Sequence, residues 1–357
     1  MQVNPVLEKH GLAKPGIWYV VSPCNERPCA RVGHTCCVLK TSCKISHCAS
    51  NGAVVDDDEP SEKLLFIGGA NPDGAFSDAY ILDFGEYKWF ECNWKGLTPR
   101  YEHSTFIPIN ENQDIVVFGG AQMDKNLNDV WVLENGLWCL SVPSGRIPTP
   151  RTCHSAAALH NKLYIFGGGE SGTEPTQDRK LHVYDAKENC WSQPLVQGES
   201  PTSRHGHVMV TIGNNIYIHG GMAGAEMFAD LWKLTISDED LVWSQPKTTG
   251  DIPCKMAAHA GCAVHSMLYL FGGMNENGAS MDDLYSLNTD LMVWRRIYCD
   301  GPPPHCRLDH TMCSVTVSRS SDDERLGKVW QTFIVVFGGM DAVGQIFDDC
   351  LAFLVSE

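Results

Sequence analysis

An arginine followed three positions later by a histidine recurs along this chain of 357 residues. Both side chains could do chemistry, because imidazole nitrogens bind metal ions and guanidinium groups bind carboxylates through paired hydrogen bonds. Copies placed around one axis would form a ring of metal-binding groups or a basic surface for an acidic partner. The copies are Arg31/His34, Arg100/His103, Arg151/His154, Arg204/His207 and Arg307/His310, with a degenerate copy at Met256/His259.

The repetition itself favours a structural role for the histidines, since a side chain found in every repeat belongs to the scaffold more often than to a unique site. We therefore predict that all six pack in the interior and bind no metal. Two interpretations stay open for Arg31, Arg100, Arg151, Arg204 and Arg307. They are candidate residues for contact with an acidic partner, or they pair internally with an aspartate that also recurs, at Asp78, Asp129, Asp230 and Asp283.

The sixteen cysteines include one metal-like cluster, formed by Cys36, Cys37, Cys43, His47 and Cys48. Its spacing matches no standard zinc pattern, and the chain contains no Cys-x-x-Cys pair. Many other cysteines fall in apolar segments, where cysteine behaves as a small hydrophobic residue. We expect reduced thiols, no metal and no cofactor.

The elements that position these residues follow from two further repeated features. A pair of glycines ends a β-branched or aromatic run at Gly68, Gly119, Gly167, Gly220, Gly272 and Gly338, at steps of about 50 residues. This is the period of kelch-type propeller blades, each a four-stranded antiparallel sheet. A tryptophan precedes each next Arg-x-x-His, at Trp89, Trp138, Trp191, Trp243 and Trp294. The sequence therefore predicts an all-β, six-bladed kelch β-propeller in which the tryptophans pack between blades.

The sixth repeat ends without its tryptophan, and Trp18 stands at the matching distance before Arg31. We therefore predict that the N-terminal segment 16–22 supplies the last strand of the last blade, which removes an exposed sheet edge. The expected single domain covers 1–357, with repeats at about 31–89, 100–138, 151–191, 204–243, 256–294 and 307–355. Two repeats carry insertions, at 40–62 and 317–330, between their first and second strands.

Composition excludes several classes of function. The formal net charge of −16 disfavours nucleic-acid binding and unaided attachment to anionic membranes. The chain shows no signal core, apolar span or lipidation signal, so we expect no direct membrane anchor. No HExxH, GxSxG, P-loop or dinucleotide motif occurs, which indicates a binding protein rather than an enzyme.

Longer strings make the match more specific than single repeats do. PCARVGH, GGANPDGAFSD, KGLTPRYEHSTFIP, FGGGESGTEPTQDRKLHVYDA, RHGHVM, IHGGMAG and RLDHTMC occur in order. From about residue 16 onward the chain resembles the family of Rab-nine effector proteins with kelch motifs.

The resemblance implies a cytoplasmic, non-enzymatic Rab effector, which we expect to be a monomer. Its partner would be the GTP form of a late-endosomal Rab GTPase, with other trafficking proteins as further partners. It would support vesicle transport from endosomes to the trans-Golgi network and associate peripherally with the endosome membrane. The alternative is a kelch substrate receptor that presents short peptides to a ubiquitin ligase, although no residues remain for an adaptor-binding domain.

Overall fold

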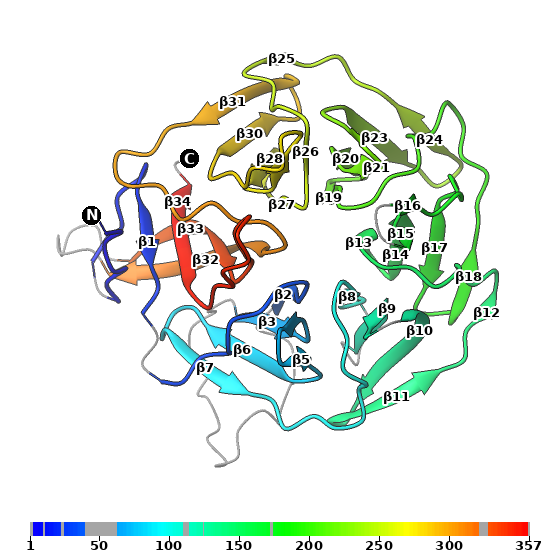
Figure 1. Cartoon of the computed structure of the whole chain (residues 1–357), viewed down its shortest axis with the longest axis horizontal. Coiled ribbons are helices and arrows are strands. Elements are labelled where there is room, and N and C mark those ends of the chain that lie inside the picture. Colours follow the sequence, from blue (N-terminus) through cyan, green and yellow to red (C-terminus); the bar gives the residue numbers. More distant parts are fainter. Residues whose placement is uncertain are drawn as a thin grey trace.

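The chain forms six sheets of four or five strands, arranged as blades around a central channel (Figure 1). The computed structural model describes residues 3–9, 11–22, 25–39, 63–109, 114–123, 125–171, 174–320 and 328–355. Within these ranges no helix is long and apolar enough to cross a membrane. The predicted all-β six-bladed propeller is confirmed.

Each blade has four main strands, and the successive strands lie at increasing distance from the channel (Figure 1). Blade one contains β2 (Thr35–Leu39), β3 (Lys63–Ile67), β6 (Ala79–Asp83) and β7 (Lys88–Glu91); blade two contains β8 (Ser104–Phe106), β9 (Ile115–Gln122), β10 (Lys125–Glu134) and β11 (Leu137–Ser141). Blade three contains β13 (Ser155–Leu159), β14 (Lys162–Phe166), β17 (His182–Asp185) and β18 (Cys190–Ser192); blade four contains β19 (Val208–Ile212), β20 (Asn215–His219), β23 (Leu231–Ile236) and β24 (Leu241–Ser244). Blade five contains β27 (Ala260–Val264), β28 (Met267–Phe271), β30 (Leu284–Asn288) and β31 (Val293–Ile297).

Short strands of two or three residues lie within the loops. They are β4 (Ala70–Asn71), β5 (Gly74–Ala75), β12 (Ser144–Gly145), β15 (Gly169–Ser171), β16 (Glu174–Pro175), β21 (Met222–Ala223), β22 (Glu226–Met227), β25 (Thr249–Gly250), β26 (Met256–Ala257) and β29 (Met274–Asn275). Most of them belong to the connections between the second and third strands. We call the side of the disc that carries these connections, together with the arginines, the loop face.

Blade six closes the ring with both ends of the chain. It contains β32 (Thr311–Ser320), β33 (Lys328–Phe337), β34 (Cys350–Val355) and, as its outermost strand, β1 (Trp18–Val20). β1 runs antiparallel to β34, and Trp18 lies opposite Phe353. The predicted closure through the N-terminal strand is therefore confirmed.

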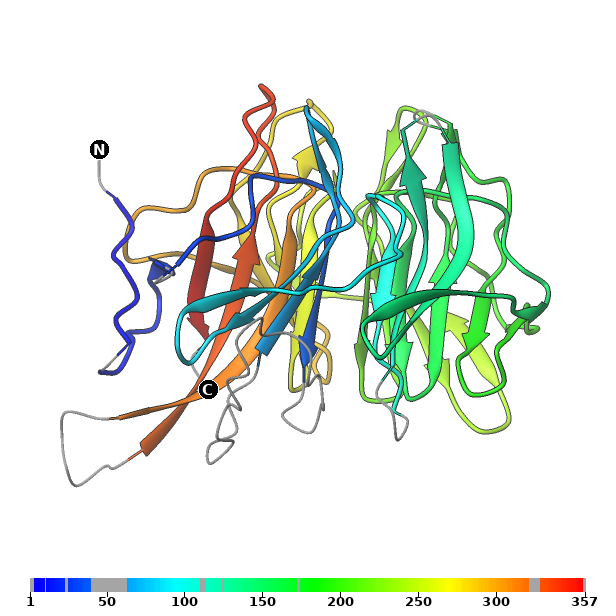
Figure 2. The same ribbon diagram turned by 90° about the horizontal axis from the view of Figure 1, so that it is seen from below.

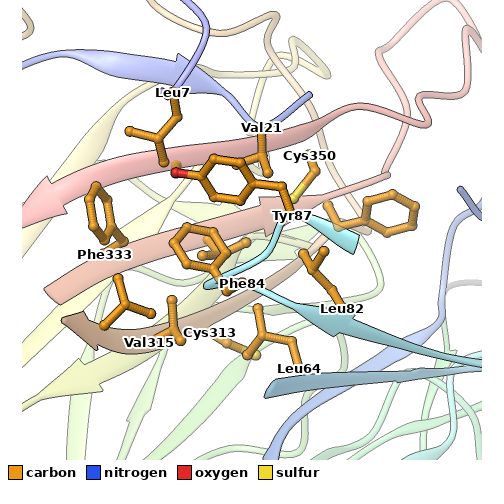
Figure 3. Close-up of a cluster of buried hydrophobic side chains, with 14 of the residues drawn as sticks. Leu7, Val21, Leu64, Leu82, Phe84, Tyr87, Cys313, Val315, Phe333 and Cys350 are labelled. Atoms are coloured by element: carbon orange, nitrogen blue, oxygen red, sulfur yellow. The ribbon is translucent and has the colours of Figure 1, made fainter. Parts of the chain in front are cut away.

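The hydrophobic core is divided into six clusters, one between each pair of neighbouring blades. Each cluster contains one of the six repeated tryptophans, whose exposed fractions lie between 0% and 6%. Figure 3 shows the cluster between blades six and one, in which Leu7 and Val21 of the N-terminal segment cover Phe333 and Cys350. Since a blade buries its faces only against its neighbours, the ring is stable as a whole rather than blade by blade.

The described part of the second predicted insertion, 317–330, continues regular structure, and its residues 321–327 lie outside the described residues. Residues 317–320 and 328–330 extend β32 and β33 into a long hairpin, whose register runs without interruption from Thr311/Phe337 to Ser320/Lys328. The hairpin projects from the side of the disc opposite the loop face (Figure 2). The first predicted insertion, 40–62, lies outside the described residues.

Candidate functional site

The arginines of the Arg-x-x-His repeat are buried, with exposed fractions of 0% in all five cases. Four of them form two-pronged ion pairs with an aspartate of the same blade. The shortest nitrogen–oxygen distances are 2.7 Å for Arg31–Asp78, 2.9 Å for Arg100–Asp129, 2.5 Å for Arg204–Asp230 and 2.7 Å for Arg307–Asp349.

Each guanidinium also holds the turn at its own glycine pair. Arg100 Nη1 donates to the carbonyl oxygen of Gly119 at 3.1 Å, and the other four arginines donate to the equivalent glycine. Aromatic side chains cover the flat face of the group, for example Phe228 at 4.1 Å from the Arg204 guanidinium carbon. The hydrogen-bonding capacity of the arginines is thus used inside the blade.

This geometry corrects the interpretation of these five arginines as partner-contacting residues. Each guanidinium lies beneath the surface and is already paired, so a partner could reach it only by opening the blade. The structure shows the other interpretation, an internal pair with the recurrent aspartate. Blade five has Met256 in place of arginine, and there Asp283 pairs with Arg296 instead.

The arginines lower the pKa values of two of the aspartates with which they pair. Burial alone would raise the pKa of Asp129, but the hydrogen bonds and charge of Arg100 outweigh it, so the pKa falls below 3.8. Asp230 behaves in the same way beside Arg204. Blade three is the exception: Arg151 lies 3.8 Å from Asp178, whose carboxylate instead accepts a hydrogen bond from His182 at 2.6 Å.

Replacement of Arg100 by methionine should destabilise the fold by about 3–5 kcal/mol, because Asp129 would lose its cationic partner and keep only the hydrogen bond from the neutral Trp131 indole. Arg151→Met is the matched control and should cost clearly less, since Asp178 retains His182. Urea unfolding of both variants checks this. An Arg100→Met variant of full stability that loses only partner binding would contradict the structural role.

The six repeated histidines, His34, His103, His154, His207, His259 and His310, are all buried and line the central channel. Several accept or donate across the boundary between blades: Thr35 Oγ1 lies 3.2 Å from His103 Nε2, and Thr311 Oγ1 lies 2.8 Å from His34 Nε2. Burial, followed for His34 by the charge of Arg31, lowers its pKa to about 3. The remaining five are also shifted downward, so the ring is neutral at pH 7.

Each glycine pair fits between two of these histidines. A Cβ atom on Gly220 would lie 2.9 Å from Cε1 of His259 in the next blade, and one on Gly221 would lie 2.7 Å from Cβ of His207 in the same blade. The pair at Gly338 meets His34 in the same way, across the closure of the ring. The glycines are therefore required by close packing as well as by their positive φ angles.

Gly220→Ala should consequently cost about 1–3 kcal/mol more than Gly224→Ala. Both glycines have positive φ angles, of 65° and 57°, so both variants carry the strain of a left-handed alanine. Only at Gly220 would the added methyl also meet the carbonyl oxygen of Met256, at 2.6 Å, whereas nothing lies within 4 Å at Gly224. Chemical denaturation of the two variants measures the difference, and equal costs would contradict the packing argument.

The residue before each repeated histidine lines the mouth of the channel on the loop face. These six residues, Gly33, Glu102, Cys153, Gly206, Ala258 and Asp309, all have left-handed φ angles between 46° and 62°. Backbone hydrogen bonds join them head to tail at 2.6–3.2 Å in five of the six links. At the sixth, Cys153 Sγ donates to the Glu102 carboxylate at 2.9 Å, and the Thr152 hydroxyl donates to the same oxygen.

Two cavities of about 310 and 290 Å³ lie above and below the histidine ring. Glu102, Cys153 and Asp309 line the upper one, which opens at the loop face. These three residues were not among the predicted site residues, because the repeat pattern marks only positions that recur in every blade. The signal in the sequence is the residue directly before each repeated histidine, which varies from blade to blade within the otherwise fixed Arg-x-x-His motif.

Metal-binding geometry is not found in the part of the chain that the structure describes. The thirteen cysteines in that part are free thiols. Cys36 and Cys37 of the metal-like cluster lie on β2, whereas Cys43, His47 and Cys48 fall outside the described residues.

Comparisons with known proteins agree with this architecture. A family model described as "KLHDC2/KLHL20/DRC7 Kelch-repeats domain" matches residues 46–240, 132–320 and 230–357. The "Rab9 effector protein with kelch motifs" of Mus musculus is 37% identical over 99% of this chain and 98% of its own length. The Homo sapiens protein of that name is 43% identical over 65% of this chain and 59% of its own.

Among solved structures, "Structure of YjhT" superimposes with a TM-score of 0.65 over 93% of this chain and 99% of its own. At 15% identity this likeness concerns the fold alone. The chain therefore belongs to the kelch-repeat family that includes the Rab9 effector proteins with kelch motifs.

Proposed function

We propose that this protein is a non-enzymatic effector of a Rab9-class GTPase, which binds the GTP form and supports transport from late endosomes to the trans-Golgi network. The observation that carries the proposal is the 37% identity to the mouse Rab9 effector over almost the full length of both chains. Under this proposal the protein works in the cytoplasm and reaches the endosome membrane through the GTPase.

We place the contact surface on the loop face. The buried arginines act as positioning residues there, since they fix the turns from which the exposed connections project. The tips of two connections present apolar side chains to solvent, with Met123 84% and Val343 90% exposed. Apolar side chains on a preformed support are suited to a partner surface, because little conformational freedom is lost on binding.

A titration of the purified chain with a Rab9 GTPase loaded with a non-hydrolysable GTP analogue or with GDP tests the function. The switch segments of a GTPase are ordered around the γ-phosphate, so an effector that contacts them should bind the GTP form at least tenfold more tightly. Equal affinity for the two nucleotide states would reject the effector function.

The position of the contact surface is tested with matched charged variants. Met123→Glu and Val343→Glu on the loop face should each weaken binding about tenfold or more, because each buries a charge at the interface. Leu291→Glu is the control: Leu291 is 71% exposed in the turn between β30 and β31, on the opposite side of the disc. Loss of binding in the control alone would move the surface to that side.

A further inference from the structure

The mouth of the central channel carries two carboxylates, and among the described residues no cationic side chain forms an ion pair with either. Glu102 and Asp309 lie on different blades and both line the upper cavity. Burial raises the pKa of Asp309 to about 7, and the negative charge of Glu102 is the second cause of this shift. The Asp309 carboxylate makes no hydrogen bond within the described part of the chain. A carboxylate left in this state is costly, because burial and a like charge both oppose its ionised form.

A second, independent feature of the same cavity also points to an absent ligand. The His207 and His310 side chains are 5% and 7% exposed and line the cavity from below. Neither ring nitrogen of His207 has a hydrogen-bond partner among the described residues, and neither ring nitrogen of His310 has a side-chain partner there. For His310 the cause lies in the neighbouring blade five. Thr35 and Thr311 each form a hydrogen bond with a histidine of the next blade. The residue at the same position in blade five is Ala260, which has no hydroxyl group to contact His310.

The backbone of the mouth is held in an unfavourable conformation. Glu102, Cys153, Ala258 and Asp309 have left-handed φ angles without being glycine, a conformation that is unfavourable for residues with a Cβ atom. Such backbone persists where the surrounding structure fixes it, and it gathers at sites that bind ligands. Here it directs the Glu102 and Asp309 side chains toward the cavity that they line.

We propose that this mouth binds one basic side chain, the guanidinium of an arginine or the ammonium of a lysine, presented by a protein partner docked on the loop face. The proposal deepens the proposed function, on which its choice of partner rests. A guanidinium would satisfy both carboxylates with charge-assisted hydrogen bonds. It could also donate to an acceptor nitrogen of the neutral His207 or His310 ring.

The size and surroundings of the cavity fit this occupant. Its volume of about 310 Å³ is roughly ten times the 30 Å³ share of a water molecule in the liquid, enough for the end of an arginine side chain. Exposed acidic residues on the surrounding connections, Asp73, Glu170 and Glu226, add to a negative potential at the opening. We favour a partner's side chain over a free amine as the occupant, because the exposed apolar residues Met123 and Val343 lie on the same face as the cavity.

The cation site is tested with n-propylguanidinium as the probe and its neutral isostere n-propylurea as the control. Titration calorimetry of the full chain should give saturable binding of one n-propylguanidinium and none of the urea. A Glu102→Gln/Asp309→Asn variant should bind at least tenfold more weakly, whereas Glu239→Gln, in the exposed turn between β23 and β24 on the opposite side of the disc, should bind as the wild type does. Glutamine can still accept the Thr152 and Cys153 hydrogen bonds, and asparagine tolerates a positive φ angle, so both substitutions keep the fold, which melting curves verify. Equal binding of the urea, or undiminished binding by the double variant, would overturn the site.

The identity of the occupant is tested in a separate arm with the GTP-loaded Rab GTPase. The double variant should bind the GTPase at least tenfold more weakly than Glu239→Gln does. GTPase binding that survives the double substitution would overturn the partner's side chain as the occupant. If the wild type binds n-propylguanidinium but no GTPase, the proposed function and the partner are rejected while the cation site stands.

Discussion

Acidification from pH 7.5 to 5.5 is expected to remove most of the stability of this protein. The six histidines of the channel ring are neutral in the folded chain, because burial lowers their pKa values well below 6.5. In the unfolded chain they bind protons as the pH falls through about 6.5. Their contribution to stability is therefore fully present above pH 6.5 and is lost progressively below it.

The expected size follows from the linkage of protonation to unfolding. At pH 5.5 each such histidine costs roughly 1.4 kcal/mol, and six of them approach the whole stability of about 5–15 kcal/mol that a domain has. Asp309 opposes this trend, since its pKa is raised to about 7, but it is one group against six. The pairs of Asp129 and Asp230 are lost only below pH 3.8, because the pKa of each is lowered in the folded chain.

Urea unfolding at several pH values checks the expectation. The free energy of unfolding should decrease as the pH is lowered, most steeply below pH 6. His310→Gln should reduce the slope of this dependence by about 1.4 kcal/mol per pH unit. His160→Gln, at an exposed position in the turn between β13 and β14, should leave the slope unchanged. An unfolding free energy that is constant between pH 7.5 and 5.5 would contradict the neutral histidine ring.

The repeat allowed the fold to be predicted because every blade meets the same packing problem. The glycine pair, the histidine and the tryptophan recur together since each contacts the neighbouring blade, as Gly338 contacts His34 and Trp18 packs against Phe271. The spacing of Trp18 from Arg31 therefore indicated how the ring closes. Periodicity carries this information directly, without knowledge of side-chain conformations.

The candidate site could not be predicted in the same way. A recurring arginine and a recurring aspartate form the same pattern whether they pair with each other or face a partner, and only the burial of Arg100 and its distance to Asp129 decide between them. Glu102 and Asp309 occur once each, so no periodicity marks them. They come together because the ring places sequentially distant blades around one channel.

Deletion of residues 1–22 is expected to lower the melting temperature strongly or to cause aggregation. The deletion removes β1, so β34 becomes an exposed edge strand, and it removes Trp18, which is 0% exposed between blades five and six. Loss of a buried tryptophan side chain alone costs about 3–5 kcal/mol. Leu7 and Val21 would be lost from the adjacent cluster as well (Figure 3), and Gln331 would lose its two hydrogen bonds to Ala13.

Thermal unfolding of the truncated chain, with the single variants Trp18→Ala and Leu12→Ala beside it, separates the causes. Trp18→Ala should account for a large part of the loss, whereas Leu12→Ala, at a position that is 41% exposed, should change little. A synthetic peptide of residues 1–22 added in excess should restore stability, because it can pair with the free edge of β34 in the register of Trp18 and Phe353. Truncation that leaves the melting curve unchanged would show that the ring does not need the N-terminal strand, since an open propeller would then be as stable as a closed one.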